Sequence, residues 1–357
     1  MKAVVIEPLK ENTLHIENVE IPEIKDDEVL VKVIRVGVCG TDKEINEGLY
    51  GEAPQGSKFL ILGHESFGKI EKIGADVKDF KVGDMVVATV RRGDDCINCV
   101  AGESDMCLTG NYKERGIKGL NGYMSEYYVE KPENLVHIPD SIKEEAVLLE
   151  PFTIAEKTVI QVFKIQQRMV WEPKTAIIFG TGPVGLLTSI LLKLKGLNVY
   201  AVDRTEHIDD AKAEIFKRIG INHINSKQEN VIDKFKGMQI DIIAEATGNP
   251  IVFNECLQLF GVNSVIALLS VTGGNFKTDI DVAKLNYDMV LNNKLIVGVV
   301  NANKSYFISG IKDMQEIRDK YGDILEKFIT RRVKVSDFNN SDLQKANFEL
   351  KTVVEFE

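Results

Sequence analysis

A glycine-rich turn in the middle of the chain constrains its fold more than any other segment. Residues 180–185 read GTGPVG and stand between an apolar segment at 176–179 and a helical pattern at 184–195. Similar apolar segments follow at 197–202, 240–246, 265–270 and 295–300, with a further helical pattern at 209–219. Strands that alternate with helices in this way predict βαβ units and a doubly wound parallel sheet, so this part of the chain is of the α/β class.

The glycine spacing has a specific use within such a sheet. The residues Gly180, Thr181, Gly182, Pro183, Val184 and Gly185 match G-x-G-x-x-G directly after a strand and at the start of a helix. The first glycine allows the tight turn, the second lets a pyrophosphate approach the backbone, and the third allows close packing of helix on strand. The pattern predicts a dinucleotide site; a glycine turn that binds no dinucleotide is the alternative.

Two charged residues bear on which dinucleotide would bind. Asp203 ends the next apolar segment, 18 residues after Gly185, where a carboxylate accepts hydrogen bonds from ribose hydroxyls and favours NAD. Arg204 follows it, and a guanidinium there can hold the 2′-phosphate of NADP. The sequence therefore predicts NAD or NADP without choosing between them.

Two further residues follow strands of the same sheet. Thr247 lies after the segment at 240–246, and Asn301 follows the last apolar segment. Ligands of such sheets bind beyond the carboxyl ends of the strands, so both residues are predicted to line the nicotinamide side of the site. Either position is equally compatible with an ordinary turn.

The first part of the chain has a different pattern. Short segments rich in Val and Ile, interrupted by Gly, Asp and Pro, predict strands at 3–6, 29–36, 66–73 and 85–90. A polar, cysteine-containing excursion follows at about 91–122, and a helix is predicted at 152–168. From residue 304 onward we expect two helices and then a closing strand at 351–356 that packs back on the first part. The predicted domains are 1–153 with 303–357, and 154–302.

Metal-ligand residues occur in two segments of the β-rich part. Cys39 lies in VGVCGTD, and His64 and Glu65 lie in GHE. A thiolate, an imidazole and a carboxylate suit Zn²⁺, and an open fourth position gives a catalytic site. Glu150 precedes Pro151 and is predicted to reach the metal from the far side, directly or through water. The alternatives are a small buried thiol, a hydrogen-bonded loop histidine and a helix-start carboxylate.

A second group of thiols lies in the excursion. Cys96, Cys99 and Cys107 fall within twelve residues and would supply most of a closed, structural zinc site. Three nearby carboxylates are candidates for the fourth ligand: Asp94, Asp95 and Glu114. A metal-free site and a reducible cysteine pair are the alternatives.

Composition excludes several classes of protein. The 357 residues carry a net charge of −10, which repels nucleic-acid phosphate. No apolar run approaches the roughly 18 residues that a membrane span needs, and the first ten residues do not form a signal peptide. With five cysteines, an odd number, metal binding is favoured over disulfides. We therefore expect a cytoplasmic protein without membrane or nucleic-acid partners.

These motifs together resemble the zinc-containing medium-chain dehydrogenase/reductase family, and within it the archaeal glucose 1-dehydrogenases. The resemblance extends along the whole chain and is carried by short strings: GTDKE at 40–44, LGHE at 62–65, RRG at 91–93, ERGI at 114–117, GLNGYM at 119–124, EP at 150–151, EK at 156–157 and VN at 300–301. It implies a GroES-like β-rich catalytic domain with a cysteine lobe, beside a Rossmann domain.

The resemblance also implies roles for single residues. Cys39, His64, Glu65 and Glu150 would surround the catalytic zinc, and the lobe cysteines would hold the structural zinc. Thr41 would bridge the substrate hydroxyl and the cofactor, and the groups that bind sugar hydroxyls would be Glu114, Glu150 and Asn301. The implied reaction is oxidation of an aldose, glucose first, at C1 to the lactone with hydride transfer to NAD(P)⁺.

Three points stay open at this stage. The lobe has three cysteines where some relatives have four, and Asp203-Arg204 does not match the arginine pair of NADP-preferring relatives. Ile154 stands where some relatives carry an acidic residue near the sugar, so the preferred sugar is also open. Other functions are a polyol or secondary-alcohol dehydrogenase and a catalytically silent nucleotide-binding protein. The family leads us to expect a homodimer or homotetramer.

Overall fold

The protein consists of two compact units in a computed structural model that describes residues 1–205, 208, 210–272, 279–344 and 349–356. One unit comprises Met1–Thr153 and Asn301–Glu357, and the other comprises Ile154–Val300. Among the described residues, no helix combines the length and apolar character that a membrane crossing requires.

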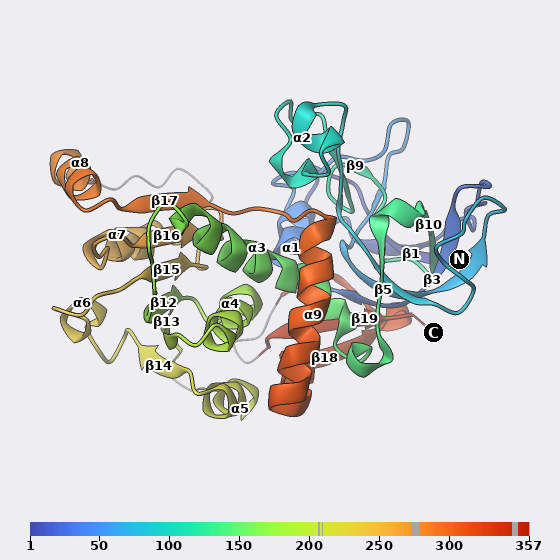
Figure 1. Ribbon diagram of the computed structural model, residues 1–357. Helices are drawn as coiled ribbons and strands as arrows, with labels where there is room; N and C mark the ends of the chain where they lie inside the picture. The colour runs from blue at the N-terminus through green and yellow to red at the C-terminus, as the bar shows by residue number, and fades with distance from the viewer. Residues whose placement is uncertain (206–207, 209, 273–278, 345–348, 357) are drawn as a thin grey trace. The chain divides into compact units, whose positions relative to one another are not determined.

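The unit Ile154–Val300 is built on a parallel sheet. Figure 1 shows its strands stacked in the order β14-β13-β12-β15-β16-β17, all parallel. The strands are β12 (Thr175–Phe179), β13 (Asn198–Asp203), β14 (Asn222–Asn225), β15 (Ile242–Glu245), β16 (Val265–Leu268) and β17 (Leu295–Gly298). The central strand β12 is buried at every residue, as expected of a strand covered on both faces. The predicted doubly wound α/β fold is confirmed.

Helices connect these strands. They are α3 (Leu149–Gln166), which begins in the other unit, α4 (Pro183–Leu194), α5 (Asp210–Ile219), α6 (Val231–Lys234), α7 (Pro250–Gln258) and α8 (Val282–Leu291). Strand β14 and helices α6, α7 and α8 were not predicted from the sequence, because short segments with mixed burial have no clear period. Residue 209, the predicted first residue of the α5 helix, lies outside the described residues.

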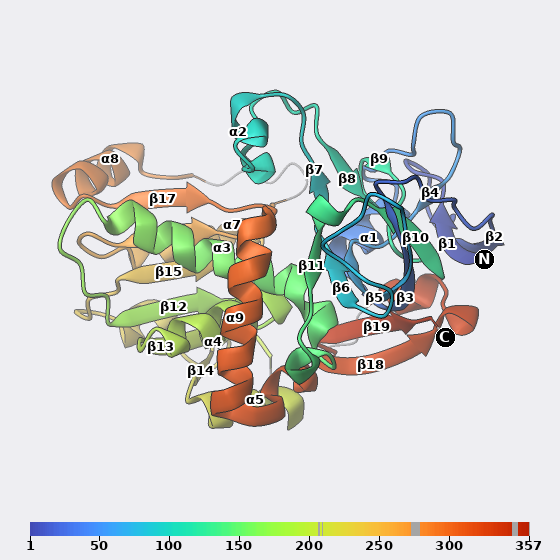
Figure 2. The ribbon, with the colours of Figure 1, turned by 45° about the vertical axis from the view of Figure 1, so that its right-hand side comes forward.

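The other unit is β-rich and holds three sheets (Figure 2). The largest has the order β11-β6-β5-β3-β19-β18, with β10 also paired to β3; the others are β2-β1-β4 and β7-β8-β9. The strands are β1 (Lys2–Ile6), β2 (His15–Asn18), β3 (Val29–Gly37), β4 (Leu60–Ile61), β5 (Glu65–Ile73), β6 (Met85–Ala88), β7 (Arg91–Arg92), β8 (Lys113–Arg115), β9 (Gly119–Leu120), β10 (Tyr127–Glu130), β11 (Leu135–His137), β18 (Ile329–Lys334) and β19 (Lys351–Glu355).

Helical elements of this unit are few. The α-helices besides the start of α3 are α1 (Gly40–Asn46), α2 (Ile97–Val100) and α9 (Lys304–Tyr321). The 3-10 segments are η1 (Ser104–Met106), η2 (Pro132–Asn134), η3 (Asp140–Ile142), η4 (Ala146–Leu148), η5 (Gly322–Phe328), η6 (Val335–Asp337) and η7 (Asn340–Leu343). The cysteine-containing lobe around α2 stands out from the sheets in both views.

The tail returns to the β-rich unit through β19, which pairs antiparallel with β3 and parallel with β18. The prediction of two helix-like segments from residue 304 onward was right in part: among the described residues from 304 onward, α9 is the only α-helix, and strand β18 with short 3-10 segments follows it. Strand β18 alternates between half-buried and exposed residues, as a strand does, but its apolar residues Ile329 and Val333 are four apart in the sequence, a spacing that fits a helix face as well as a strand face.

Candidate active site

Three metal-ligand side chains meet at one end of strands β3 and β5. Cys39 precedes helix α1, His64 precedes β5, and Glu65 is the first residue of β5. Their ligand atoms all lie within 4.8 Å of one another. His64 and Glu65 are buried, whereas Cys39 is half-buried, so the cluster has one accessible side. The residues singled out by sequence are therefore brought together by the sheet.

Asp42 supports two of these side chains, a role that the sequence analysis did not assign. It is fully buried, and its Oδ2 accepts a hydrogen bond from the backbone N–H of Cys39 at 2.8 Å. Its Oδ1 lies 3.7 Å from Nδ1 of His64, and neither atom has a hydrogen-bond partner in the described part of the chain. This arrangement directs Nδ1 toward Asp42 and leaves Nε2 for a metal ion.

Lys351 supports the third side chain. Its ammonium group lies 2.6 Å from both carboxylate oxygens of Glu65 and donates to the carbonyl of Val38 at 3.3 Å. Both charged side chains are almost completely buried. The sequence offered no signal for this pair, because Lys351 lies on β19, far away along the chain.

Strand β3 makes room for Glu65. Gly37 pairs with Glu65 across β3 and β5, and a Cβ at Gly37 would lie 1.9 Å from Oε2 of Glu65. Any other residue at this position would force the carboxylate to move. Gly37 is thus required by the close approach of a side chain.

Glu150 lies in the first turn of α3 and is buried. Burial raises its pKa to about 7, with an opposing effect of His64 and a reinforcing effect of Glu65. It does not belong to the group of ligand atoms within 4.8 Å of one another. For His64, burial disfavours the charged form, but Asp42, Cys39 and Glu150 together raise its pKa well above the ordinary value.

This concentration of buried acidic groups fits a divalent cation. Asp42, Glu65 and Glu150 are buried carboxyl groups beside the Cys39 thiol, and Lys351 and, without a metal ion, the protonated His64 are the cations that the described residues place among them. Buried charge of one sign is costly unless it is compensated. A sulfur, a nitrogen and an oxygen ligand with an accessible side are also the donor set of a catalytic zinc site.

Backbone packing behind His64 depends on three glycines. Gly63 has a positive φ of 87°. A Cβ at Gly116 would lie 2.5 Å from the carbonyl oxygen of Gly63, and one at Gly122 would lie 2.3 Å from it. The GHE, ERGI and GLNGYM strings thus occur together because they pack backbone against backbone.

Two of the three residues implicated in binding sugar hydroxyls, Glu114 and Asn301, also lie together. Nδ2 of Asn301 donates to Oε1 of Glu114 at 2.6 Å, and Arg91 contacts the same oxygen through Nε and Nη2, both at 3.0 Å. Thr41 lies on α1, two residues after Cys39, and is half-buried. Glu114, one of the three candidates for the fourth ligand of the lobe zinc, therefore contacts Asn301 and Arg91 instead.

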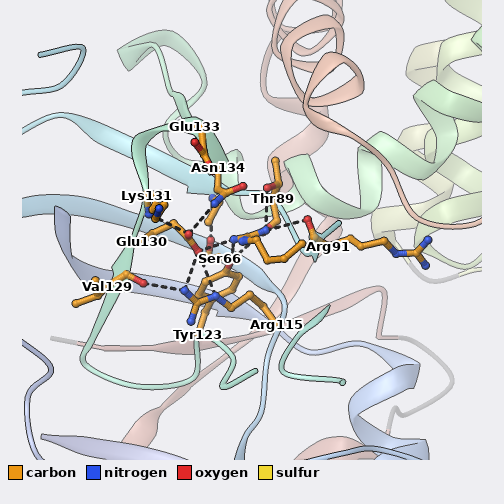
Figure 3. A network of polar contacts seen from close by, with 12 residues as sticks. Ser66, Thr89, Arg91, Arg115, Tyr123, Val129, Glu130, Lys131, Glu133 and Asn134 are labelled. Atoms are coloured by element: carbon orange, nitrogen blue, oxygen red, sulfur yellow. Dashed lines mark hydrogen bonds and ion pairs between the residues drawn. The ribbon is translucent and has the colours of Figure 1, made fainter. Parts of the chain in front are cut away.

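The neighbouring arginines have a structural role (Figure 3). Successive side chains of a strand point to opposite faces, so Arg92 and Arg115 turn away from the Arg91–Glu114 pair. Both bind the buried carboxylate of Glu130, at 2.5 and 2.9 Å. Figure 3 shows the Arg91 side chain pointing away from this network. In each of the strings RRG and ERGI, the first residue (Arg91 or Glu114) belongs to the Arg91–Glu114 pair. The second residue (Arg92 or Arg115) binds Glu130 on the opposite face.

The lobe forms a second cluster of ligand atoms. Those of Asp94, Cys96, Cys99 and Cys107 lie within 4.8 Å of one another, and the described residues thereby place Asp94 beside the three thiols. The hydrogen-bonding contact between Cys107 and the Thr109 hydroxyl lowers the pKa of Cys107 to about 7. Burial and the neighbouring thiols raise the pKa of Cys99 to about 12, which a bound cation would reverse.

The dinucleotide loop joins β12 to α4. Gly180 has a φ of 101°, and a Cβ at Gly185 would lie 2.0 Å from the carbonyl oxygen of Gly180. A Cβ at Gly182 would meet nothing within 4 Å. Thr247 lies beside the turn, since its Cγ2 is 3.1 Å from the position of a Gly180 Cβ. The three glycines thus provide a tight turn, open space and close helix packing.

Asp203 is held by a set of donors that the sequence analysis missed. It accepts hydrogen bonds from Nε2 of His223 at 2.9 Å, from Thr205 N–H at 3.0 Å, and from the hydroxyl of Thr181. Burial opposes its ionisation, but these hydrogen bonds prevail and lower its pKa to about 2. Arg204 is exposed.

Comparisons with known proteins agree with this arrangement. Residues 25–140 match the alcohol dehydrogenase GroES-like domain, and residues 143–356 match the glucose dehydrogenase C-terminus family. Glucose 1-dehydrogenase of Methanocella arvoryzae is 40% identical over 99% of each chain. The chain belongs to the glucose 1-dehydrogenase family. It is therefore an oxidoreductase, and the family resemblance inferred from its motifs is confirmed.

Other members of the glucose 1-dehydrogenase family are similar over nearly their full length. The enzyme of Thermoproteus tenax is 37% identical, with 96% of this chain and 95% of the relative covered. The structure of Haloferax mediterranei glucose dehydrogenase in complex with NADP, Zn and gluconolactone is 32% identical and covers 100% of this chain and 99% of its own, with a TM-score of 0.90.

Proposed function

We propose that this glucose 1-dehydrogenase homologue oxidises an aldose, glucose first, at C1 with NAD⁺ or NADP⁺ and a catalytic zinc ion. The observation that carries the proposal is the Cys39–His64–Glu65 cluster, whose ligand atoms lie within 4.8 Å of one another and which is accessible on the side of Cys39. The C1–H bond breaks with hydride transfer to the nicotinamide, and the C1 hydroxyl proton is released to solvent. The products are the lactone, the reduced nicotinamide and one proton.

The chain's own residues bind and orient the reactants. When bound, zinc supplies a Lewis acid that makes a hydroxyl more acidic, and the nicotinamide accepts hydride. Cys39, His64 and Glu65 would hold the ion, with Glu150 as a more distant acidic group. Thr41 orients the C1 hydroxyl and passes its proton outward. Glu114 and Asn301 would select sugar hydroxyls, because a buried polar group left unpaired penalises the wrong substrate.

The test is turnover by the zinc-loaded protein with a panel of glucose, galactose, sorbitol and 2,3-butanediol and with each nicotinamide. Absorbance of the reduced nicotinamide with glucose supports the proposal. Turnover of sorbitol or butanediol alone would select the polyol or secondary-alcohol dehydrogenase. No turnover with any of these substrates would contradict both.

Two variants test the metal model. Cys39→Ala and His64→Ala should each abolish turnover and lower the bound zinc while dinucleotide binding, followed by fluorescence, persists. Cys256→Ala is the matched control, because Cys256 is a buried thiol of the other unit. Full activity in either Cys39→Ala or His64→Ala would show that the cluster is not the catalytic centre.

We also propose that Asp94, Cys96, Cys99 and Cys107 hold a second, structural zinc ion. Gly93 supports this cluster, since a Cβ there would lie 2.7 Å from Sγ of Cys99. Metal analysis should give two zinc ions per chain, falling to one in Cys107→Ser. One ion in the unaltered protein would exclude the lobe site.

A second copy of the chain is the proposed partner. Strand β17 has a hydrogen-bonded neighbour on one side only among the described strands. Helix α8 beside it exposes Tyr287, Val290 and Leu291. An apolar surface at an open sheet edge favours pairing with another chain. Light scattering should report a dimer or tetramer that Val290→Glu dissociates, whereas Ile251→Glu on the exposed surface of α7 should not.

A further inference from the structure

Five polar residues of the β-rich unit are linked into a ring, hereafter the polar ring, by four contacts and by the backbone between residues 301 and 303: Arg91, Asp105, Glu114, Asn301 and Asn303. Arg91 contacts Oε1 of Glu114 as described above and donates through Nη1 to the carbonyl oxygen of Asp105 at 3.2 Å. Nδ2 of Asn303 donates to Oδ1 of Asp105 at 2.8 Å. Asn301, two residues earlier, closes the ring through its contact with Glu114.

The amide groups of the polar ring are held in one orientation. Asn303 caps helix α9, and its Oδ1 accepts from the N–H of Ser305 at 2.9 Å, so its NH₂ group must face Asp105. Oδ1 of Asn301 accepts from the N–H of Ala302 at 2.7 Å, so its NH₂ group faces Glu114. The donors of both side chains are therefore fixed by the backbone that carries them.

The polar ring is mostly shielded from water. Arg91, Asp105, Glu114 and Asn303 expose between 5% and 8% of their surface. Hydrogen bonds to charged groups in such surroundings are stronger than those on the surface, so the ring resists deformation.

One oxygen of the polar ring remains available to a ligand. Every contact to Glu114 described above ends on Oε1. In the described part of the chain, Oε2 has no hydrogen-bond partner. It is also not one of the fully buried polar atoms without a partner, so it is accessible. The ring therefore presents a single carboxylate oxygen in a fixed direction, together with the second N–H of the Asn301 amide.

We propose that Arg91, Asp105 and Asn303 are positioning residues for sugar recognition, which act by fixing the carboxylate of Glu114 and the amide of Asn301. This inference rests on the proposed function, because it takes Glu114 and Asn301 to bind hydroxyl groups of an aldose. It also gives the lobe a role: Asp105 lies in the loop between Cys99 and Cys107, so this loop sets the geometry of the sugar site.

The expected signature is a change in sugar binding and not in hydride transfer. Contacts to hydroxyls remote from C1 are made in the ground state and in the transition state alike, so weakening them raises KM and leaves kcat unchanged. The groups proposed to hold the pyrophosphate and the ribose, residues 180–185 and Asp203, belong to the other unit. The KM for the nicotinamide should therefore change less than the KM for the sugar, although Asn301 is also predicted to line the nicotinamide side.

The decisive variant is Asn303→Asp. Aspartate caps a helix as well as asparagine does, so α9 keeps its cap, but a carboxylate oxygen replaces the NH₂ group and faces Asp105. Asn339→Asp is a matched control: Asn339 caps η7, and its Oδ1 likewise accepts from the N–H and hydroxyl of a serine two residues later. A second variant, Arg91→Lys, keeps the positive charge but lacks the planar fork that contacts Glu114 and Asp105 together.

Steady-state kinetics of the zinc-loaded protein provide the readout. Asn303→Asp and Arg91→Lys should each raise KM for glucose about tenfold, the equivalent of one charged hydrogen bond. The kcat and the KM for the nicotinamide should change far less than the KM for glucose and stay close to those of Asn339→Asp. Asn303→Asp should also lower the melting temperature, because its carboxylate faces that of Asp105 inside the protein. Discrimination between glucose and galactose should decrease in both variants.

Two results would overturn this inference. Unchanged KM for glucose in both variants would show that the ring does not act on the sugar. A parallel loss of kcat, nicotinamide affinity and melting temperature would indicate a general structural role instead. An unaltered protein that oxidises no aldose contradicts the proposed function itself; if it oxidises a polyol, the KM comparison is made with that substrate and decides the inference in the same way.

Discussion

Lys351 holds Glu65 by both carboxylate oxygens at 2.6 Å, although the two residues are 286 positions apart in the chain. The closing strand β19 thereby compensates the charge of a residue that begins β5. Both side chains are withdrawn from water. The pair joins the end of the chain to the candidate metal site. We expect its loss to lower the free energy of unfolding more than it lowers the catalytic rate.

Replacing the lysine removes that compensation. Lys351→Met should lower the free energy of unfolding of the zinc-free protein by about 3 kcal/mol, because a buried carboxylate is left unpaired. Added zinc should restore part of the loss. The measurement is denaturant unfolding with and without a chelator. Lys131→Met, which breaks an exposed ion pair with Asp27, is the control and should change stability little. Equal stability of Lys351→Met and the unaltered protein would contradict the role given to this pair.

Gly37 should be needed for metal binding. Gly37→Ala places a methyl group at a position 1.9 Å from Oε2 of Glu65, so the carboxylate must move. We expect zinc affinity at the catalytic site to fall at least about tenfold, as for other losses of ligand orientation. A Cβ at Gly40 meets nothing within 4 Å, so Gly40→Ala should bind zinc normally in the same competition assay.

The second and third glycines of the dinucleotide loop should behave differently. Gly182→Ala should leave the melting temperature nearly unchanged and weaken dinucleotide binding, because its methyl group occupies the space left for the pyrophosphate. Gly185→Ala should lower the melting temperature, because its methyl group would collide with the carbonyl of Gly180. Calorimetry and fluorescence titration separate the two effects; the same response from both variants would disprove this division of roles.

Asp203 should discriminate between the two nicotinamides. Its pKa of about 2 means that it is ionised throughout the working pH range, so it repels a 2′-phosphate at every such pH. Asp203→Asn should raise the ratio of kcat/KM for NADP⁺ over NAD⁺ by about tenfold, equivalent to one lost charge interaction. Asp210→Asn, an exposed acid at the start of α5, is the control. An unchanged ratio would assign the choice to other residues.

Glu145 should make stability depend on pH. Burial raises its pKa from 4.5 to about 7, so the folded protein binds a proton that the unfolded chain releases. The free energy of unfolding should therefore fall by roughly 2 kcal/mol as the pH rises from about 4.5 to 7, and then level off. Glu145→Gln should lack this contribution when melting curves are compared across that interval. A slope of equal size in both proteins would exclude Glu145 as its source.

The α/β fold and the family could both be predicted from the amino-acid sequence. The glycine turn after an apolar strand has few other uses, and the segments that alternate around it leave a parallel sheet as the arrangement that buries them. The sequence-based prediction was poorest in the tail, where Ile329 and Val333 of β18 are four residues apart and fit a helix face as well as a strand face. Local periodicity does not separate the two when pairing with β19 decides the outcome.

Tertiary structure alone decided which side chains support the candidate site. Cys39, His64 and Glu65 are recognisable by type and spacing, because metal ligands belong to a small set of residues. Lys351, Asp105 and Asn303 are ordinary residues whose roles arise only from contacts between distant segments. Those contacts arise where β19 pairs with β3 and where α9 begins beside the lobe. Because the contacting residues are far apart in the chain, no local sequence pattern indicates that they meet.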